Sequence, residues 1–506
     1  MLPYKIFAGF LSLTARVILT ILPVVIFLFS ASAQKLVLPG DYPDPSVVKI
    51  GDTYWASATS SNWFPAYPLL HSKDLVNWQT SGYIFNQKPE WADYYFWAPE
   101  MTYDKGKVYV YYAAHKKGGN LCVGVASADK PEGPYKDHGP LICEAAGSID
   151  AFPMRDESGK LFLIWKEDGN SVKKPTPIWI QEMNEERTAL MGEKKELFRN
   201  DAPWEANLVE GVSMIKHNGY IYAIYAAAGC CGPGCTYTTG VARATNLMGP
   251  WEKDPGNPVL TGTDEWKCPG HGTAVEKNGK FYFLYHAYNT ESDVFTGRQG
   301  LLSEFTFTPE GWINFVKQPE AENKPESVID EFRGRALSSK WQWNIFHNIN
   351  AKVKNGYLKL SALPTATGSF LGQTVLTGKY RASAVILRKK STAQPGIGIL
   401  GDEKNTISAM YKGDSIQVVV VKDCQPTIVA SQKVSGSKKL YLKADVTGGY
   451  NIIFSYSTTG LNYSVLNKIP LNGSFLPPWD RGLRVGPVAK GPENLRAVLD
   501  EFRIEY

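Results

Sequence analysis

The sequence predicts an all-β protein, a five-bladed β-propeller followed by a β-sandwich of the jelly-roll, concanavalin-like type. Three observations lead to this prediction. The 506-residue chain holds 27 Tyr, 22 Phe, 14 Trp, 46 Gly and 32 Pro, which favours short strands joined by tight turns. A glycine turn followed by a strand pattern recurs five times, and no stretch after residue 33 keeps an apolar period of 3.6 residues.

Residues 1–33 have the features of a signal peptide. The stretch 17–30 is apolar but interrupted by Pro23, so it is too short for the ~20 residues that comfortably cross a bilayer. Basic residues precede it, and Ala31-Ser32-Ala33 follows, which is typical of a secretory signal cut before Gln34. We therefore expect an exported protein, periplasmic or secreted, with no membrane span after cleavage.

Residues 34–318 are predicted to form the propeller. Each repeat has a turn glycine followed by a strand of aromatic and aliphatic residues, and successive glycines lie 55, 53, 60 and 60 residues apart. That spacing is sufficient for about four short strands per blade. The five turn glycines are Gly51, Gly106, Gly159, Gly219 and Gly279.

A second domain is predicted for residues 328–506, after a linker over 319–327 that is rich in Pro, Glu, Asn and Lys. Its strands are short and alternating, with turn signals between them, as in a β-sandwich. Asp330-Glu331-Phe332 near its start resembles Asp500-Glu501-Phe502 near its end. We expect the first and last strands of this domain to be neighbours in one sheet.

The net charge of +5 is small for this length, and Lys and Arg are scattered without forming a basic stripe. This distribution argues against nucleic acid as a partner.

The propeller repeat makes one further prediction. The innermost strand of each blade faces the axis, so polar residues six to nine positions before the five glycines should converge on one cavity. Buried carboxylates cost several kcal/mol unless they are paired, so their repetition indicates chemistry rather than packing. Two carboxylates in one pocket are the minimal equipment for glycoside hydrolysis. The residues are Asp44, Glu100, Asp150, Glu210 and His271.

At these residues the sequence resembles glycoside hydrolase family 43, most specifically in the opening Tyr42-Pro43-Asp44-Pro45-Ser46. The resemblance covers the whole mature chain. It implies Asp44 as general base, Asp150 as the residue that tunes pKa and orientation, and Glu210, which opens Glu-Gly, as general acid. It also implies inversion of configuration, with the base and acid about 6.5–9.5 Å apart. Val212-Ser213 stands where many members have Pro-His, which weakens inferences about sugar contacts.

The resemblance extends to residues beyond the three carboxylates. It implies that His271 is an axial histidine that holds a water or a structural calcium ion, although a histidine in a strand can also be a core residue. No cofactor is required for the chemistry. Arg298 is similar to an arginine that contacts the substrate or the tuning carboxylate. Trp97 and Trp63 can stack on sugar faces or pack between blades, and Glu100 is expected at the substrate.

Three of the seven cysteines, Cys230, Cys231 and Cys235, lie in one Gly-rich stretch. Their spacing fits no standard zinc pattern. After export a disulfide is plausible, either between Cys230 and Cys231 or between Cys235 and one of these neighbours; free thiols are the alternative.

The expected function is exo-acting release of a terminal pentose from arabinoxylan, arabinan, xyloglucan or xylan fragments. An α-L-arabinofuranosidase is favoured, with a β-xylosidase as the alternative. A non-catalytic sugar-binding propeller would not need the acid and base pair. A fructan-cleaving propeller is disfavoured because its Asn-Asp-Pro-Asn and Arg-Asp-Pro motifs are missing from the sequence.

Overall fold

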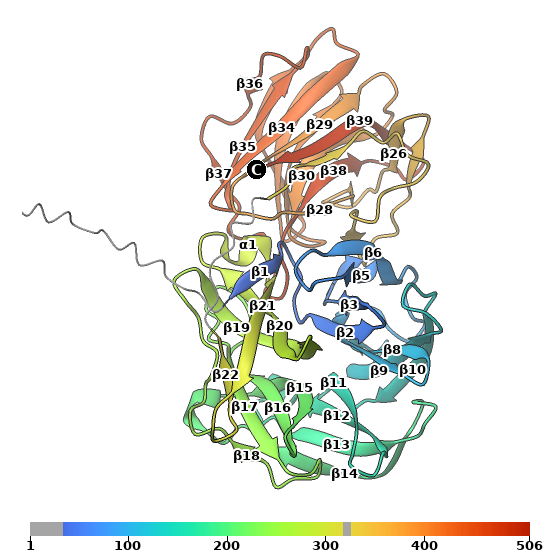
Figure 1. Cartoon of the computed structure of the whole chain (residues 1–506). Helices are drawn as coiled ribbons and strands as arrows, with labels where there is room; N and C mark the ends of the chain where they lie inside the picture. Colours follow the sequence, from blue (N-terminus) through green and yellow to red (C-terminus); the bar gives the residue numbers. More distant parts are fainter. Residues whose placement is uncertain (1–33, 317–324) are drawn as a thin grey trace, which may run out of the picture.

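The computed structural model describes residues 34–316 and 325–506. The predicted signal peptide and most of the predicted linker lie outside the described residues. The described chain forms two bodies, a propeller and a sandwich stacked upon it (Figure 1). Helical structure in it is limited to α1 (Asp293–Thr296) and two 3-10 turns, η1 (Gly169–Val172) and η2 (Pro203–Glu205). The prediction of an all-β protein with a five-bladed propeller is confirmed.

Four blades are antiparallel sheets of four strands each, formed by consecutive parts of the chain. In blade 1 they are β2 (Ser46–Ile50), β3 (Thr53–Ser57), β5 (Ala66–Ser72) and β6 (Gln79–Phe85). Blade 2 has β7 (Trp97–Asp104), β8 (Lys107–His115), β9 (Leu121–Ala128) and β10 (Lys136–Ile142). Blade 3 has β11 (Ser148–Arg155), β12 (Leu161–Glu167), β13 (Ile178–Met183) and β14 (Leu190–Phe198), and blade 4 has β15 (Val209–His217), β16 (Tyr220–Ala227), β17 (Thr238–Ala244) and β18 (Glu252–Lys253).

The fifth blade combines the two ends of the propeller sequence. Its later strands are β19 (Trp266–Lys277), β20 (Lys280–Asn289), β21 (Gln299–Phe307) and β22 (Ile313–Phe315). The first strand of the described chain, β1 (Lys35–Leu38), pairs antiparallel with β21, with Lys35 opposite Leu302. The ring is thus closed by hydrogen bonds between its first and its last strands.

The five turn glycines confirm the repeat. Each lies between the first and second strands of its blade with a positive φ, from 59° at Gly51 to 87° at Gly159. A Cβ at any of the five would meet no atom within 4 Å, so it is the left-handed backbone, and not crowding, that favours glycine there.

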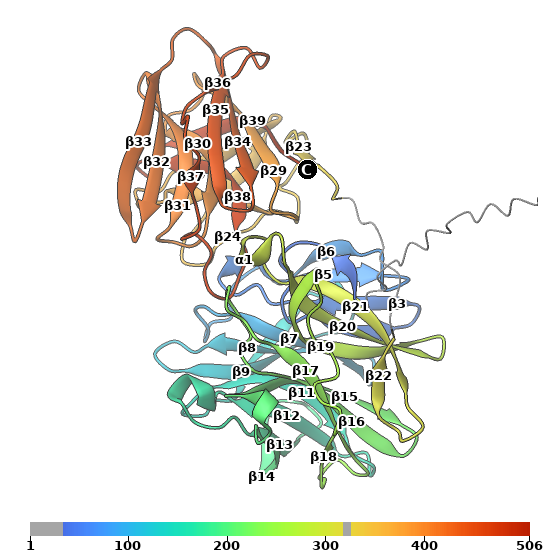
Figure 2. The same cartoon turned by 90° about the vertical axis from the view of Figure 1, so that its left-hand side faces the viewer.

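The C-terminal domain is a sandwich of two antiparallel sheets (Figure 2). One sheet holds β23 (Val328–Asp330), β25 (Ala351–Lys354), β26 (Tyr357–Ser361), β29 (Tyr380–Leu387), β34 (Lys439–Thr447), β35 (Asn451–Ser457), β36 (Ser464–Val465), β37 (Leu471–Asn472) and β39 (Arg496–Glu505). The other holds β27 (Ser369–Phe370), β28 (Gln373–Thr374), β30 (Gln394–Leu400), β31 (Thr406–Lys412), β32 (Ser415–Lys422), β33 (Gln425–Lys433) and β38 (Arg484–Lys490). Apolar side chains of both sheets, such as Leu442 and Ile399, share one buried cluster.

The expected pairing of the first and last sandwich strands is confirmed, because β23 pairs with β39 and Asp330 lies opposite Phe502.

A short two-stranded ladder joins the domains: β4 (Trp63–Phe64) of the propeller pairs with β24 (Trp343–Asn344). The Trp63 side chain is 0% exposed, and its Nε1 donates a hydrogen bond of 3.2 Å to the carbonyl oxygen of Gly482. It packs among sandwich residues that include Met410 and Val488. The expectation that Trp63 stacks on sugar is therefore wrong, because the docked sandwich covers the indole.

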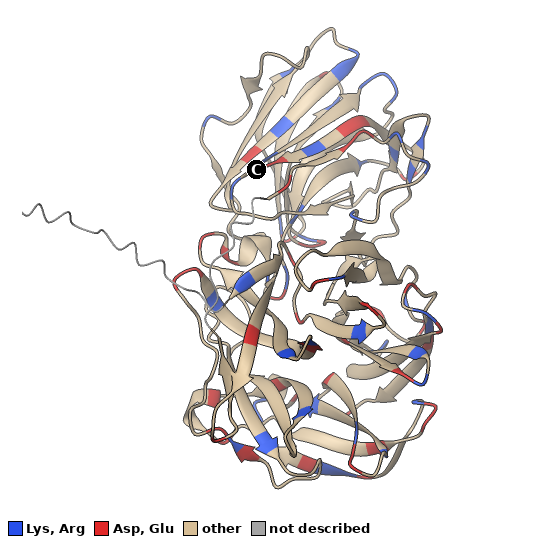
Figure 3. Ribbon diagram, in the orientation of Figure 1, with Lys and Arg blue, Asp and Glu red and all other residues tan. Residues whose placement is uncertain are grey.

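Acidic and basic residues are interspersed along the strands and loops of both domains (Figure 3). None of the helices in the described ranges has the length and apolar character needed to span a bilayer.

Candidate active site

A cavity of about 350 Å³ is lined by residues of both domains. The sequence-predicted residues on its wall are Asp44, Trp97, Asp150, Glu210, Cys230, Cys231, His271 and Arg298. The wall also includes Trp479 and Asp480, which belong to the sandwich loop between β37 and β38 that reaches down to the propeller (Figure 2). Three residues predicted near the site, Glu100, Trp63 and Cys235, are not part of its lining.

The inner end of every blade carries one residue with a left-handed backbone. The φ values are 51° at Asp44, 43° at Ala98, 56° at Asp150, 61° at Gly211 and 42° at His271. In blades 2 to 5 the ladder between the first two strands shifts register at this point, which is the mark of a β-bulge. A bulge bends its strand and re-aims the side chains around it, so the same device recurs around the axis beside the cavity.

The bulges explain why Glu100 is not in the cavity. The equivalent position in blade 2 is Ala98, and Glu100 lies two residues further along β7, where it accepts a hydrogen bond of 2.8 Å from the Thr273 hydroxyl. Burial raises the pKa of Glu100 to about 8, against the hydrogen bond from Thr273. The prediction that Glu100 lies at the substrate is therefore wrong.

Asp44 is surrounded by donors. Arg298 Nη1 lies 2.8 Å from its Oδ1, and the Thr59 hydroxyl donates to its Oδ2 at 2.7 Å. Its backbone N–H donates to His286 Nδ1 at 3.0 Å, which fixes the backbone as well. Burial alone would raise the pKa of this carboxyl, but the positive charge of Arg298 and the nearby His271 hold it far below its usual value. Asp44 is thus anionic at any working pH.

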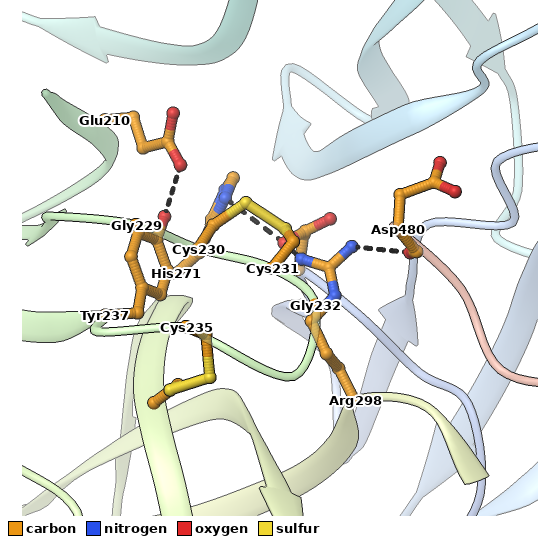
Figure 4. The surroundings of a disulfide bond; sticks show 12 residues. Glu210, Gly229, Cys230, Cys231, Gly232, Cys235, Tyr237, His271, Arg298 and Asp480 are labelled. Atoms are coloured by element: carbon orange, nitrogen blue, oxygen red, sulfur yellow. Dashed lines mark hydrogen bonds and ion pairs between the residues drawn. A yellow bond between two sulfur atoms is a disulfide. The ribbon is translucent and has the colours of Figure 1, made fainter. Parts of the chain in front are cut away.

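Arg298 therefore contacts a different carboxylate from the one expected. The resemblance implied a contact with the substrate or with the tuning residue Asp150. The guanidinium pairs with Asp44, and the contact with the substrate stays a prediction. Its Nη2 also donates to the backbone oxygen of Asp480 at 3.1 Å, which joins the site to the sandwich (Figure 4).

Glu210 has one strong basic partner. Lys166 Nζ lies 2.5 Å from Glu210 Oε2 and 3.0 Å from Asp168 Oδ1. The Tyr237 hydroxyl donates to Glu210 Oε1 at 2.7 Å (Figure 4). Burial works to raise the pKa of Glu210, but Lys166 and Tyr237 outweigh it and lower that pKa. Lys166 is almost fully buried, which makes its charge effective.

Asp150 has the opposite electrostatic surroundings. Its Oδ2 accepts a hydrogen bond of 3.0 Å from the backbone N–H of Gly211, next to Glu210. Burial and the negative charge of Glu210 raise the pKa of Asp150 to about 6, although His271 opposes them. Asp150 and Glu210 thus influence each other's protonation.

His271 Nδ1 lies 3.5 Å from Asp44 Oδ1 and 3.9 Å from Asp150 Oδ2. Its ring fills the space beside Gly211, where a Cβ would approach the His271 Cγ to 2.6 Å, so this position accepts only glycine. Within the described residues, no group of three or more His, Cys, Asp or Glu side chains is arranged to hold a metal ion. The expected calcium site near His271 finds no support.

The sequence reasoning missed Lys166, Asp168, Tyr237, Trp479 and Asp480. Lys166 did leave a signal, because a lysine at the end of the apolar run Leu161-Phe162-Leu163-Ile164-Trp165 needs a partner when buried. The two sandwich residues reach the site only through the docking of the second domain, so nothing in their local sequence marks them.

Three disulfides are present: Cys230–Cys231, Cys235–Cys268 and Cys122–Cys143. Of the open alternatives, the bond between Cys230 and Cys231 is the one found. The alternative pairing of Cys235 with one of these neighbours is wrong, because Cys268 on β19 is its partner. Cys424 is free and exposed.

Comparison with known proteins agrees with this arrangement. A xylan 1,3-beta-xylosidase of Vibrio sp is 28% identical over 274 residues, which cover 51% of this chain and 50% of that relative. A xylosidase/arabinosidase of Butyrivibrio fibrisolvens is 26% identical over 466 residues, with 81% of this chain and 87% of the relative covered.

Among solved structures, the GH43 BlXynB protein from Bacillus licheniformis has the same fold, with a TM-score of 0.79 at 24% identity. The superposition covers 94% of this chain and 100% of that one, so both domains are shared. The model of the Glycosyl hydrolases family 43 matches residues 33–313, more than half of the chain and nearly all of the propeller. This protein therefore belongs to glycosyl hydrolase family 43.

Proposed function

We propose that this protein is an exported, exo-acting and inverting glycoside hydrolase that releases a terminal pentose, with α-L-arabinofuranose favoured. One observation carries the proposal: a carboxylate held anionic, Asp44, and a second carboxylate of different surroundings, Glu210, line the same cavity. Unequal carboxylates in one pocket support a division into base and acid. A sugar-binding propeller without catalysis would have no need of this difference.

In the proposed mechanism Asp44 accepts a proton from a water molecule as that water attacks the anomeric carbon. The bond from this carbon to the leaving oxygen breaks, and Glu210 gives its proton to that oxygen. Because the water attacks from the face opposite the leaving group, the configuration inverts. Glu210 must carry a proton for this step, and it forms one coupled pair with Asp150, whose pKa is raised to about 6 by burial and by Glu210.

The exo-acting preference is supported by the sandwich loop. Trp479 and Asp480 form part of the cavity wall, so the second domain bounds the cavity on this side. A bounded cavity suits the end of a chain or a side branch. We expect arabinoxylan, arabinan, xyloglucan or xylan fragments as substrates.

A β-xylosidase is the second candidate, favoured by the names of the Vibrio and Butyrivibrio relatives. Export is supported by the three disulfides, since such bonds persist mainly in oxidising compartments.

The test is to assay the purified protein on nitrophenyl α-L-arabinofuranoside and nitrophenyl β-D-xyloside, with Asp44→Ala, which lacks the proposed base, as the inactive control. NMR of the first-formed sugar anomer checks inversion. Faster turnover of the arabinofuranoside supports the favoured function, and faster turnover of the xyloside selects the second candidate. Cleavage of internal arabinan bonds with no activity on either glycoside would overturn the exo-acting proposal.

A further inference from the structure

The disulfide between the adjacent residues Cys230 and Cys231 lies on the wall of the cavity. Both residues are half-buried and line it together with Glu210, Arg298 and Asp480. Figure 4 shows the sulfur pair in the view between Glu210, on one side, and Arg298 with Asp480 on the other. An apolar, polarisable group thus stands among the charged groups of the site.

The loop that carries this disulfide is held in place by other bonds. At its base, Thr236 N–H donates to the Gly229 oxygen at 2.8 Å, and Gly229 N–H donates to the Thr236 hydroxyl at 3.1 Å. Gly232 N–H donates to the Tyr288 hydroxyl at 3.3 Å. The Cys235–Cys268 disulfide ties the loop to β19.

A bond between Cys230 and Cys231 contributes little to this anchoring. Disulfide stabilisation grows with the length of chain that the bond closes, and the sequence separation here is 1, against 33 for Cys235 and Cys268. The effect of the adjacent bond is local: it fixes both side chains and replaces two thiols by one surface without S–H donors. Sulfur is polarisable and makes favourable contacts with apolar groups.

We propose that the Cys230–Cys231 disulfide is a specificity-determining contact, a rigid apolar platform against which the C–H face of the bound pentose packs. The inference rests on the proposed function, since it takes a sugar to occupy the cavity. A pentose presents hydroxyl groups at its edge and C–H groups on its face. The carboxylates and Arg298 suit the edge, and the sulfur pair suits the face.

The experiment uses selective reduction and reads KM separately from kcat. A dithiol reductant supplies two electrons and two protons. One of its sulfurs attacks the Cys230–Cys231 bond, which frees one cysteine and leaves the other in a mixed disulfide with the reductant. The second sulfur of the reductant then attacks this mixed disulfide and frees the other cysteine. The products are two cysteine thiols and the cyclic oxidised reductant. Alkylation and mass spectrometry of the peptide establish which bonds were reduced. We expect KM for the nitrophenyl pentoside to rise about 5- to 10-fold with kcat within about twofold, the pattern of lost uniform binding.

Two double variants make the assignment. Cys230→Ala/Cys231→Ala should have the raised KM from the start and show no further change with reductant. Cys235→Ala/Cys268→Ala, which keeps the adjacent bond, should respond to reductant as the parent does. An unchanged parent KM after verified reduction would overturn the proposal, as would a persisting response in Cys230→Ala/Cys231→Ala.

A binding measurement tests the platform even if the protein does not hydrolyse these substrates. If the parent hydrolyses neither glycoside, the same comparison is made by calorimetric titration with arabinose and xylose. Weaker binding of either sugar after reduction supports the platform without catalysis. Equal binding before and after reduction, or no binding of either sugar by the oxidised parent, overturns it.

Discussion

The Asp480 carboxylate of the sandwich accepts a hydrogen bond of 3.2 Å from the Trp97 indole Nε1 of the propeller. The same Asp480 oxygen accepts a hydrogen bond from the Ser61 hydroxyl, and its other oxygen pairs with Arg481 at 2.8 Å. Asp480 is 1% exposed. One buried carboxylate thus fixes an aromatic wall of the cavity to the second domain, so cavity shape and domain docking are coupled.

Asp480→Ala should weaken the docking of the two domains and also change the shape of the cavity. It leaves Ser61, Trp97 and Arg481 without their acceptor, and we expect a loss of about 3 kcal/mol in the free energy of unfolding, together with a raised KM. Urea unfolding and steady-state kinetics measure the two effects. Asp480→Asn keeps one acceptor oxygen and should lose less of both. An alanine variant with the stability and KM of the parent would contradict the coupling.

Acid and base variants should differ in how they depend on the leaving group. Glu210→Ala should lower kcat/KM by about 10²- to 10⁴-fold on an alkyl glycoside or oligosaccharide and much less on a nitrophenyl glycoside, whose leaving group needs little protonation. Asp44→Ala should lower kcat/KM by a similar factor on the alkyl and the nitrophenyl glycoside, because the attacking water lacks its base with either substrate. Kinetics on a matched pair of substrates measures the difference. The same leaving-group dependence in both variants would refute the division of roles.

The charge of Asp150 should set the alkaline limb of the pH profile. Its pKa is raised to about 6 by burial and by Glu210, so kcat/KM should fall as the proton of this pair leaves above about pH 6. Asp150→Asn removes a negative neighbour, which lowers the pKa of Glu210. The alkaline limb should therefore move to lower pH, by about one unit. A limb that stays in place or moves to higher pH would rule this out.

Lys166 should act in the opposite sense. It lowers the pKa of Glu210, so Lys166→Met should raise that pKa and move the alkaline limb to higher pH. Lys166→Arg keeps the positive charge and should leave the limb within about half a unit of the parent's position. The test is the pH dependence of kcat/KM for the parent, Lys166→Met and Lys166→Arg. An alkaline limb at the same pH in the two variants would count against this role of Lys166.

Glu100 should make stability depend on pH. Its pKa of about 8 in the folded protein lies above the ordinary 4.5, so unfolding releases its proton between these values. This group's contribution to stability is full below about pH 4.5 and decreases by about 1.4 kcal/mol per unit as pH rises toward 8. Glu100→Gln should flatten the decline of Tm across this window. Parallel Tm curves would argue against a half-buried, protonated Glu100.

The repeat made much of this fold predictable. Five copies of a glycine turn leave a periodic signal, and the left-handed backbone at Gly51 and its counterparts explains why glycine recurs. The repeat predicts Asp44, Asp150 and Glu210 at one cavity because each lies in or just before the innermost strand of its blade. Counting back from the turn glycine of blade 2 gave Glu100 as a cavity residue, whereas the position at the cavity is Ala98. The count was wrong because a β-bulge changes which side chains face the cavity and leaves no recognisable pattern in the sequence.

The contacts between the propeller and the sandwich could not be predicted from the sequence. Trp63 of the propeller and Asp480 of the sandwich each have partners in the other domain, more than 250 residues away along the chain. Cys235 finds its partner 33 residues away, on a strand that local spacing does not identify.

The pairing of β1 with β21 sets an order of events for a growing chain. Lys35 leaves the ribosome early, whereas its neighbour Leu302 follows more than 250 residues later. Before β21 is made, β1 has no partner strand and the ring of blades is open. The circle can therefore close only after β21 has been made, and a chain that stops before β21 carries an unsatisfied strand edge that favours aggregation.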